Sequence, residues 1–136
     1  MTKSDKNTVI LGAFLMALTI GLGAFGAHGL KALVATTSLE TFETGVRYQM
    51  YHSLAVVMLG LANMVPRSVK KWPVRLFVLG MILFSGSLYL LTFQNVWEVD
   101  LSVVGPITPL GGLLLISGWV LLGIRLLTMN RDNSAR

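Results

Sequence analysis

Hydrophobic residues gather in four long stretches that contain no Lys, Arg, Asp or Glu, and polar residues separate these stretches. The four stretches are Thr8–Leu30, Tyr48–Pro66, Leu76–Trp97 and Leu101–Ile124. Each is close to the roughly 20 helical residues that cross a hydrocarbon layer about 30 Å thick. The pattern predicts an all-α membrane protein with four transmembrane helices in an antiparallel bundle, spanning about residues 8–30, 48–66, 74–97 and 106–127.

The segment between the first two stretches is less apolar and carries its own helical pattern. Leu39, Phe42 and Val46 fall on one stripe, and Thr37 followed three residues later by Glu40 fits a capping box. We therefore expect a short amphipathic helix at the membrane interface that bends near Gly45 into the second span. One continuous helix from Ser38 to Met64 is the alternative.

Small residues recur along the predicted spans at helical spacing. Ala13, Ala17 and Gly21 lie four residues apart in the first span, and Gly111 and Gly118 lie seven apart in the last. Small faces let helix backbones approach closely in lipid, where packing drives association. We interpret both sets as packing seams.

The basic residues lie almost entirely on one side of the predicted spans. Nine of the 11 fall at the chain ends and in the second connection, whereas Lys31 and Arg47 fall on the other side. This bias predicts that both termini are cytoplasmic. The formal charge of +5 then reflects a positive face beside anionic lipid head groups, and predicts membrane lipids rather than nucleic acid as partners.

Composition agrees with a membrane domain and removes several classes of site. Hydrophobic residues make up 54% of the 136 positions and charged residues 12%, about half the charged share of a soluble domain. We expect a single domain. The absence of cysteine excludes disulfides and thiolate metal sites. The first apolar stretch exceeds the 7–15 residues of a cleavable signal core, so we expect it to remain as an anchor.

A polar cluster is predicted within the membrane around His52. Tyr48 and His52 share a face with small residues, Gln49 lies beside it, and His28 leaves the first span on the same outer side. The functional interpretation is a cluster of His28, Tyr48, Gln49 and His52 for binding or proton transfer. The structural interpretation, which we favour, is an interhelical hydrogen bond that fixes packing, with His28 among the head groups.

Catalytic and cofactor chemistry find little support in the sequence. Two histidines without a third ligand make a weak metal or haem site, so no cofactor is predicted. Ser85 and Ser87 lie at mid-membrane without a base expected within reach, so no enzyme is predicted. Trp119 is interpreted as a packing residue. None of the four apolar stretches contains a charged residue, which disfavours an ion-coupled carrier.

Four segments together resemble the domain-of-unknown-function 423 family of small multi-pass bacterial inner-membrane proteins. They are Gly23–Leu30, Thr44–His52, Phe84–Tyr89 and Thr108–Gly112. The resemblance implies a four-span inner-membrane protein and brings no established reaction or ligand. The leading hypothesis is a non-enzymatic protein that maintains the envelope through lipids or a membrane-protein partner. The alternative is a small-solute or proton pathway, formed by a homo-oligomer, that uses the histidine cluster.

Overall fold

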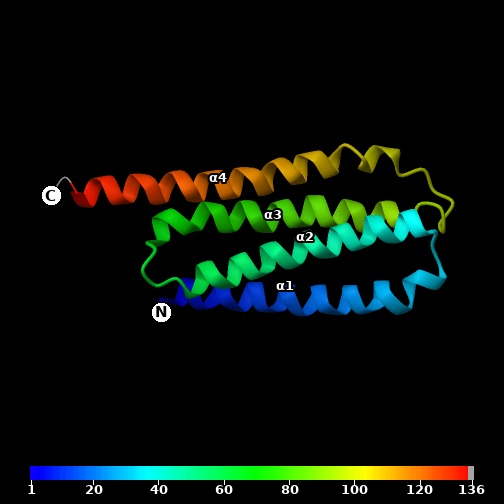
Figure 1. Ribbon diagram of the computed structural model, residues 1–136, viewed down its shortest axis with the longest axis horizontal. Coiled ribbons are helices and arrows are strands. Elements are labelled where there is room, and N and C mark those ends of the chain that lie inside the picture. The colour runs from blue at the N-terminus through cyan, green and yellow to red at the C-terminus, as the bar shows by residue number, and fades with distance from the viewer. Residues whose placement is uncertain (135–136) are drawn as a thin grey trace.

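The computed structural model describes residues 1–134, which are helical with short connections and contain no strand. The helices are α1 (Lys3–His28), α2 (Thr36–Leu61), α3 (Arg67–Thr92) and α4 (Ile107–Ser134), with short 3₁₀ turns at Leu30–Ala32 and Ser102–Val104. Consecutive helices run in opposite directions, so the start of α1 and the end of α4 lie at the same end of the molecule (Figure 1). The first three helices have 26 residues each, or about 39 Å, enough to cross the hydrocarbon layer and enter both interfaces.

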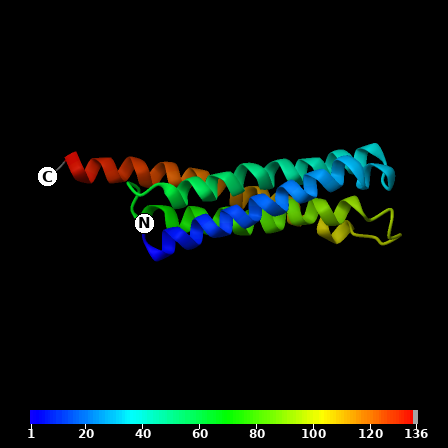
Figure 2. The ribbon, with the colours of Figure 1, turned by 90° about the horizontal axis from the view of Figure 1, so that it is seen from below.

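Each helix packs on the next one along the chain. α1 contacts α2, α2 contacts α3 and α3 contacts α4, which leaves α1 and α4 at opposite edges (Figure 1). A second view shows all four helices extended along the same long axis (Figure 2). Because α2 and α3 occupy the middle, buried side chains concentrate on these two helices.

Large apolar side chains point outward from the edge helices. Phe14 and Ile20 of α1 are 73% and 66% exposed, and Ile116 of α4 is 61% exposed. Polar side chains, in contrast, are buried between the helices: Gln49, His52, Ser53 and Ser85 are all less than 10% exposed. This inverted distribution suits a surface surrounded by lipid, because a water-soluble monomer rarely exposes so continuous an apolar surface.

Three helical segments within the described residues are long and apolar enough to cross a membrane by length and composition. They are Lys3–Ala32, Arg67–Thr92 and Ser102–Met129. α2 is not among them, because its first half carries charged residues such as Glu40, Glu43 and Arg47. An all-helical fold with three apolar candidate spans is therefore established.

The separate interfacial helix expected before the second span does not form. α2 runs unbroken from Thr36 to Leu61 through Gly45, as in the continuous alternative. Gly45 does not bend the helix; it makes room for the ring of Tyr89, 2.7 Å from where a Cβ would stand. The predicted capping box at Thr37 is also wrong, because the cap position is Ala35 and no side chain caps this helix.

Two other helix ends differ from the prediction. α1 begins earlier, at Lys3, because Thr2 and Asp5 form a capping box in which each side chain accepts from the other's backbone N–H. α2 ends at Leu61 rather than near Pro66, and Pro66 instead precedes α3. Pro73 therefore lies in the second turn of α3.

The packing seam of α1 is rotated from the predicted one. Ala13, Ala17 and Gly21 are exposed, and the buried positions of α1 recur every seven residues: Asp5, Gly12, Thr19 and Gly26. A Cβ on Gly12 would stand 2.7 Å from the Val57 side chain, and one on Gly60 would stand 2.6 Å from that of Val9. Glycine at both positions therefore permits close approach of α1 and α2.

The predicted seam of α4 is confirmed. A Cβ on Gly111 would overlap the backbone of Phe84, and one on Gly118 would stand 2.6 Å from the ring of Phe77. Leu115 and Leu122 complete the buried stripe between these glycines and α3. The seven-residue spacing thus identified the face of α4 that packs on α3.

Candidate functional site

Gln49 links α2 to both of its neighbours through its side-chain amide. The amide nitrogen donates to the Thr19 hydroxyl of α1 at 2.8 Å, and the amide oxygen accepts from the Tyr89 hydroxyl of α3 at 2.9 Å. Thr19 in turn donates to the backbone oxygen of Leu15 at 2.7 Å. The carboxamide suits this position because it supplies donors on one side and an acceptor on the other.

His52, one turn further along α2, reaches α4. The Trp119 indole N–H donates to His52 Nε2 at 3.1 Å, and His52 Nδ1 lies 2.7 Å from the backbone oxygen of Tyr48. Phe77 packs its ring against both partners, with centroids 5.2 Å from His52 and 4.9 Å from Trp119. His52 is 5% exposed, so these contacts surround the imidazole.

The two hydrogen bonds determine the state of the imidazole. Indole N–H can only donate, and a backbone carbonyl can only accept. Nε2 must therefore accept from Trp119, and Nδ1 must carry the proton that it donates to Tyr48. This is the neutral ring, since protonation of Nε2 would place two donors face to face.

A cavity of about 340 Å³ borders this pair on the side away from α1. Its walls come from α2, α3 and α4 and include Tyr48, Phe84, Leu115 and Trp119. Tyr48 is 40% exposed, and its ring packs on Phe84 with centroids 4.6 Å apart. The cavity is mainly apolar, so acyl chains suit it better than hydrated solutes.

His28 does not join the cluster. It is exposed at the end of α1 and makes no side-chain hydrogen bond within the described residues. Gly26 lies against Phe42 and Thr19 bonds to Gln49, so His28 is level with about residue 40 of α2. His52 lies about twelve residues further, or about 18 Å away along the helix. The structure thus places Tyr48 beside His52, directs Gln49 toward α1 and α3, and leaves His28 apart.

Serine and threonine hydroxyls form further links between helices. Ser85 of α3 donates to the backbone oxygen of Gly45 in α2 at 2.7 Å. Ser87 and Thr108 join α3 to the start of α4 at 2.7 Å, and Thr92 donates to the backbone oxygen of Ser38 at 3.3 Å. No buried side-chain nitrogen or oxygen within the described residues lacks a hydrogen-bond partner.

An ion pair joins α1 and α3 at the end where the chain begins. Lys70 Nζ lies 2.7 Å from Asp5 Oδ1, and it also donates to the backbone oxygen of Ala62 at 3.1 Å. The lysine thereby satisfies a carbonyl at the C-terminus of α2, where cations are favourable. Both side chains are largely buried, at 6% and 10% exposure.

Sequence reasoning missed several members of this network. It assigned Trp119 to packing and gave no role to Thr19, Tyr89 or the Asp5–Lys70 pair. One signal was available: Asp5, Gly12, Thr19 and Gly26 repeat every seven residues, which would have placed the two polar members inward. No group of three His, Cys, Asp or Glu side chains within residues 1–129 could hold a metal ion.

Comparison with known proteins gives a consistent result. The family described as "Protein of unknown function (DUF423)" matches residues 22–112. A UPF0382 membrane protein of Staphylococcus haemolyticus is 40% identical over 117 residues, covering 86% of this chain and 92% of that protein. The UPF0382 membrane protein YwdK of Bacillus subtilis is 39% identical over 122 residues (86% and 93%), and a Haemophilus influenzae relative is 37% identical over 101 (74% and 77%). No solved structure matches the chain.

Proposed function

This chain belongs to the DUF423 family and is an integral membrane protein, and from that premise we propose that its intramembrane polar residues hold the helices together rather than carry out chemistry. In this proposal the protein is a single domain with four spans and no enzymatic activity. It contributes to the envelope through its contacts with lipids or with membrane proteins. The network centred on α2 gives it a defined shape on which those contacts depend.

The observation that carries the proposal is that every buried polar side chain in the part of the chain that the structure describes has a hydrogen-bond partner. Both nitrogens of His52 are engaged, and Gln49 uses its oxygen and its nitrogen. A proton relay needs neighbours that can deliver and take up a proton, and neither an indole N–H nor a backbone carbonyl does so. His52 would lose the bond from Trp119 on accepting a proton, so its arrangement favours a structural role.

The serine that sequence reasoning considered as a nucleophile is also engaged. Ser85 donates its only hydroxyl proton to the backbone oxygen of Gly45. His52 makes its bonds to Tyr48 and Trp119, and neither nitrogen is left to act as base for that hydroxyl. This arrangement supports a non-enzymatic role.

The proposed topology has four spans with both termini cytoplasmic, in the bacterial inner membrane. α2 lies between two apolar candidate spans and packs along both, which supports its crossing with them despite its charged first half. Within residues 1–129, seven of the nine basic residues lie at the end of the molecule that holds the start of α1, the α2–α3 connection and the end of α4 (Figure 1). The positive-inside bias supports a cytoplasmic location for that end.

Reporter fusions would test this topology. A cytoplasm-active and a periplasm-active reporter would each be fused after Ala35, after Met64, after Leu101 and after Met129. We expect cytoplasmic activity at Met64 and Met129 and periplasmic activity at Ala35 and Leu101. Equal orientation at Ala35 and Met64 would show that α2 does not cross, and would overturn the four-span arrangement.

A flux assay would separate the structural role of His52 from a proton or solute pathway. Wild-type protein, the H52A variant and a Y51A control would be reconstituted in liposomes that contain a pH-sensitive dye. We expect all three to leak protons at the rate of empty liposomes, and H52A alone to unfold more readily. Wild-type flux that H52A abolishes while the variant stays folded would contradict the proposal and establish a pathway.

A further inference from the structure

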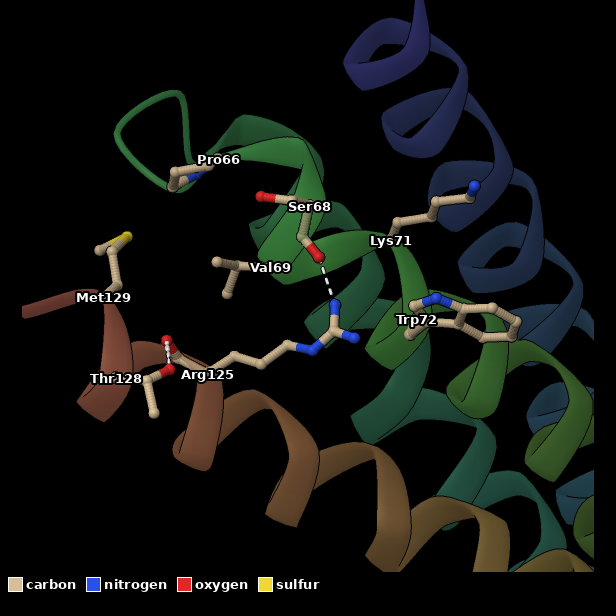
Figure 3. Close-up of a pocket in the computed structure, with 8 residues that line it drawn as sticks. All are labelled: Pro66, Ser68, Val69, Lys71, Trp72, Arg125, Thr128 and Met129. Carbon is tan, nitrogen blue, oxygen red and sulfur yellow. Dashed lines mark hydrogen bonds between the residues drawn. The ribbon is translucent and has the colours of Figure 1, made fainter. Parts of the chain in front are cut away.

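We propose that the cavity between the start of α3 and the end of α4 binds the phosphate head group of an anionic phospholipid, with an acyl chain lying in the adjoining apolar groove. This inference rests on the proposed structural function and names a ligand for it. The cavity has a volume of about 590 Å³ and is open at the surface. Its lining residues are shown in Figure 3: Pro66, Ser68, Val69, Lys71, Trp72, Arg125, Thr128 and Met129.

Charge complementarity points to an anion. Lys71 and Arg125 line the cavity, and no acidic residue does so among those whose side chains the structure describes. Arg67 and Arg75 lie within the first three turns of α3 and line a smaller neighbouring cavity, which Lys71 also borders. The acidic residue of that cavity, Asp5, is paired with Lys70. A phosphodiester is the anion that this density of cations meets at the surface of a membrane.

Arg125 is already positioned for such a contact. Its side chain extends from α4 toward α3, where one guanidinium nitrogen donates to the backbone oxygen of Ser68 (Figure 3). A guanidinium has five N–H donors, and the others make no hydrogen bond within the described residues. The bond to Ser68 holds the Arg125 guanidinium in place, so less conformational entropy is lost when its remaining donors bind phosphate.

The backbone at the start of α3 adds to the positive electrostatic potential of these basic side chains. α3 begins at Arg67 after Pro66, and no side chain caps it. Its first-turn N–H groups and the positive end of its dipole favour an anion near Ser68. The helix end reinforces the basic side chains and does not define the site without them.

The site also has an apolar extension, which a free phosphate would not need. Trp72 lines both the basic cavity and a second groove of about 420 Å³, whose other walls include Leu11, Val78 and Leu79. Arg75 stands over the Trp72 ring, 5.1 Å from its centroid. Indole rings prefer the level of the head groups, so Trp72 marks the boundary between a charged site and an acyl site. A phospholipid matches both halves.

Native mass spectrometry in mild detergent would test the proposal. Apparent affinities would be measured for phosphatidylglycerol, for phosphatidylcholine with the same acyl chains, and for inorganic phosphate. The variants would be K71Q, R125Q and the matched control K31Q, which removes an exposed lysine at the other end of the molecule. We expect K71Q and R125Q each to weaken phosphatidylglycerol binding about tenfold and K31Q to leave it unchanged.

Each contrary result has a defined meaning. Equal affinity for the two lipids would overturn recognition of the head-group charge, and inorganic phosphate that competes as well as phosphatidylglycerol would overturn the lipid assignment. Equal losses in K71Q and K31Q would show a response to net charge only, and would refute a defined site. Binding in detergent does not depend on the orientation of the protein in the membrane. The lipid site can therefore be refuted while the proposed topology holds, and the topology can be refuted while the lipid site holds.

Acyl placement can be tested by fluorescence. Phosphatidylglycerol with brominated acyl chains should quench the emission of wild-type protein more than that of W72F, because bromine quenches only at close range. Equal quenching in both proteins would remove the acyl chain from the groove beside Trp72. The Lys71 side chain is exposed, so K71Q should fold normally. The head-group test therefore remains decisive if R125Q proves unstable.

Discussion

The indole nitrogen of Trp119 donates to Nε2 of His52, and this bond of 3.1 Å joins two helices that are separated along the chain by a third. α2 and α4 make few other contacts, because each of them packs mainly against α3. The bond completes the role of α2, whose Gln49 reaches α1 and α3 and whose His52 reaches α4. Two residues one turn apart therefore connect all four helices.

Replacing Trp119 with Phe should destabilise the protein. The variant keeps an aromatic ring against Phe77 but leaves His52 Nε2 without its donor, and interhelical hydrogen bonds in lipid contribute about 0.5–2 kcal/mol. The free energy of unfolding would be measured by titration with a denaturing detergent. W97F, at a half-exposed tryptophan in the α3–α4 connection, is the control and should change stability by less than about 0.5 kcal/mol. Equal effects would show that the His52 contact contributes nothing specific.

Gln49 and Tyr89 should behave as a coupled pair. Q49L leaves the Tyr89 hydroxyl without its acceptor, and Y89F leaves the Gln49 oxygen without its donor, so each single variant should lose about 1–2 kcal/mol. Once one partner is gone, removal of the other costs less, so the double variant should fall short of the sum by about 0.5–1.5 kcal/mol. Additive losses in this double-mutant cycle would mean that the bond contributes no coupling free energy to stability.

The α1–α2 contact predicts opposite outcomes for two glycines. G60A would place a Cβ 2.6 Å from the Val9 side chain and 2.9 Å from its backbone nitrogen, so the helices must separate, at a cost of about 1–3 kcal/mol. G21A meets nothing within 4 Å and should be neutral or stabilising by up to about 1 kcal/mol, because Ala favours helix. Thermal unfolding in detergent would compare them. A G60A protein as stable as G21A would refute the close approach.

For the Asp5–Lys70 pair, a second substitution should restore part of the stability that the first one removes. K70M leaves the Asp5 carboxylate without its partner between α1 and α3, and also frees the backbone oxygen of Ala62, so it should lower the unfolding temperature. D5N in the same protein removes the unpaired charge and should restore part of the loss, as expected when burial of a lone charge is the main cost. K6M, at an exposed lysine of α1 outside the proposed lipid site, serves as the control. A double variant no more stable than K70M would show that the carboxylate is well solvated.

The composition and order of the apolar stretches determined the helical architecture. Charge-free runs of membrane-spanning length, broken by turns such as Asn63–Pro66, suffice to predict an all-helical membrane protein, because desolvating backbone polar groups forces helix formation in lipid. The basic residues at the chain ends and at Arg67–Arg75 likewise predict a topology without reference to any contact. The Gly111–Gly118 spacing even located the packing face of α4.

The tertiary structure alone decided which polar groups meet. Sequence gives each residue its angle on its own helix, but the partners of Gln49 and His52 depend on the rotation and register of three other helices. That is why Thr19, Tyr89 and Trp119 were not predicted, and why His28 was grouped with His52, which lies about 18 Å away. In lipid, apolar surface gives little preference between rotations, since every outward face finds an apolar surrounding. Close approach at Gly12 and Gly60, and the need to pair each buried polar group, select the observed one.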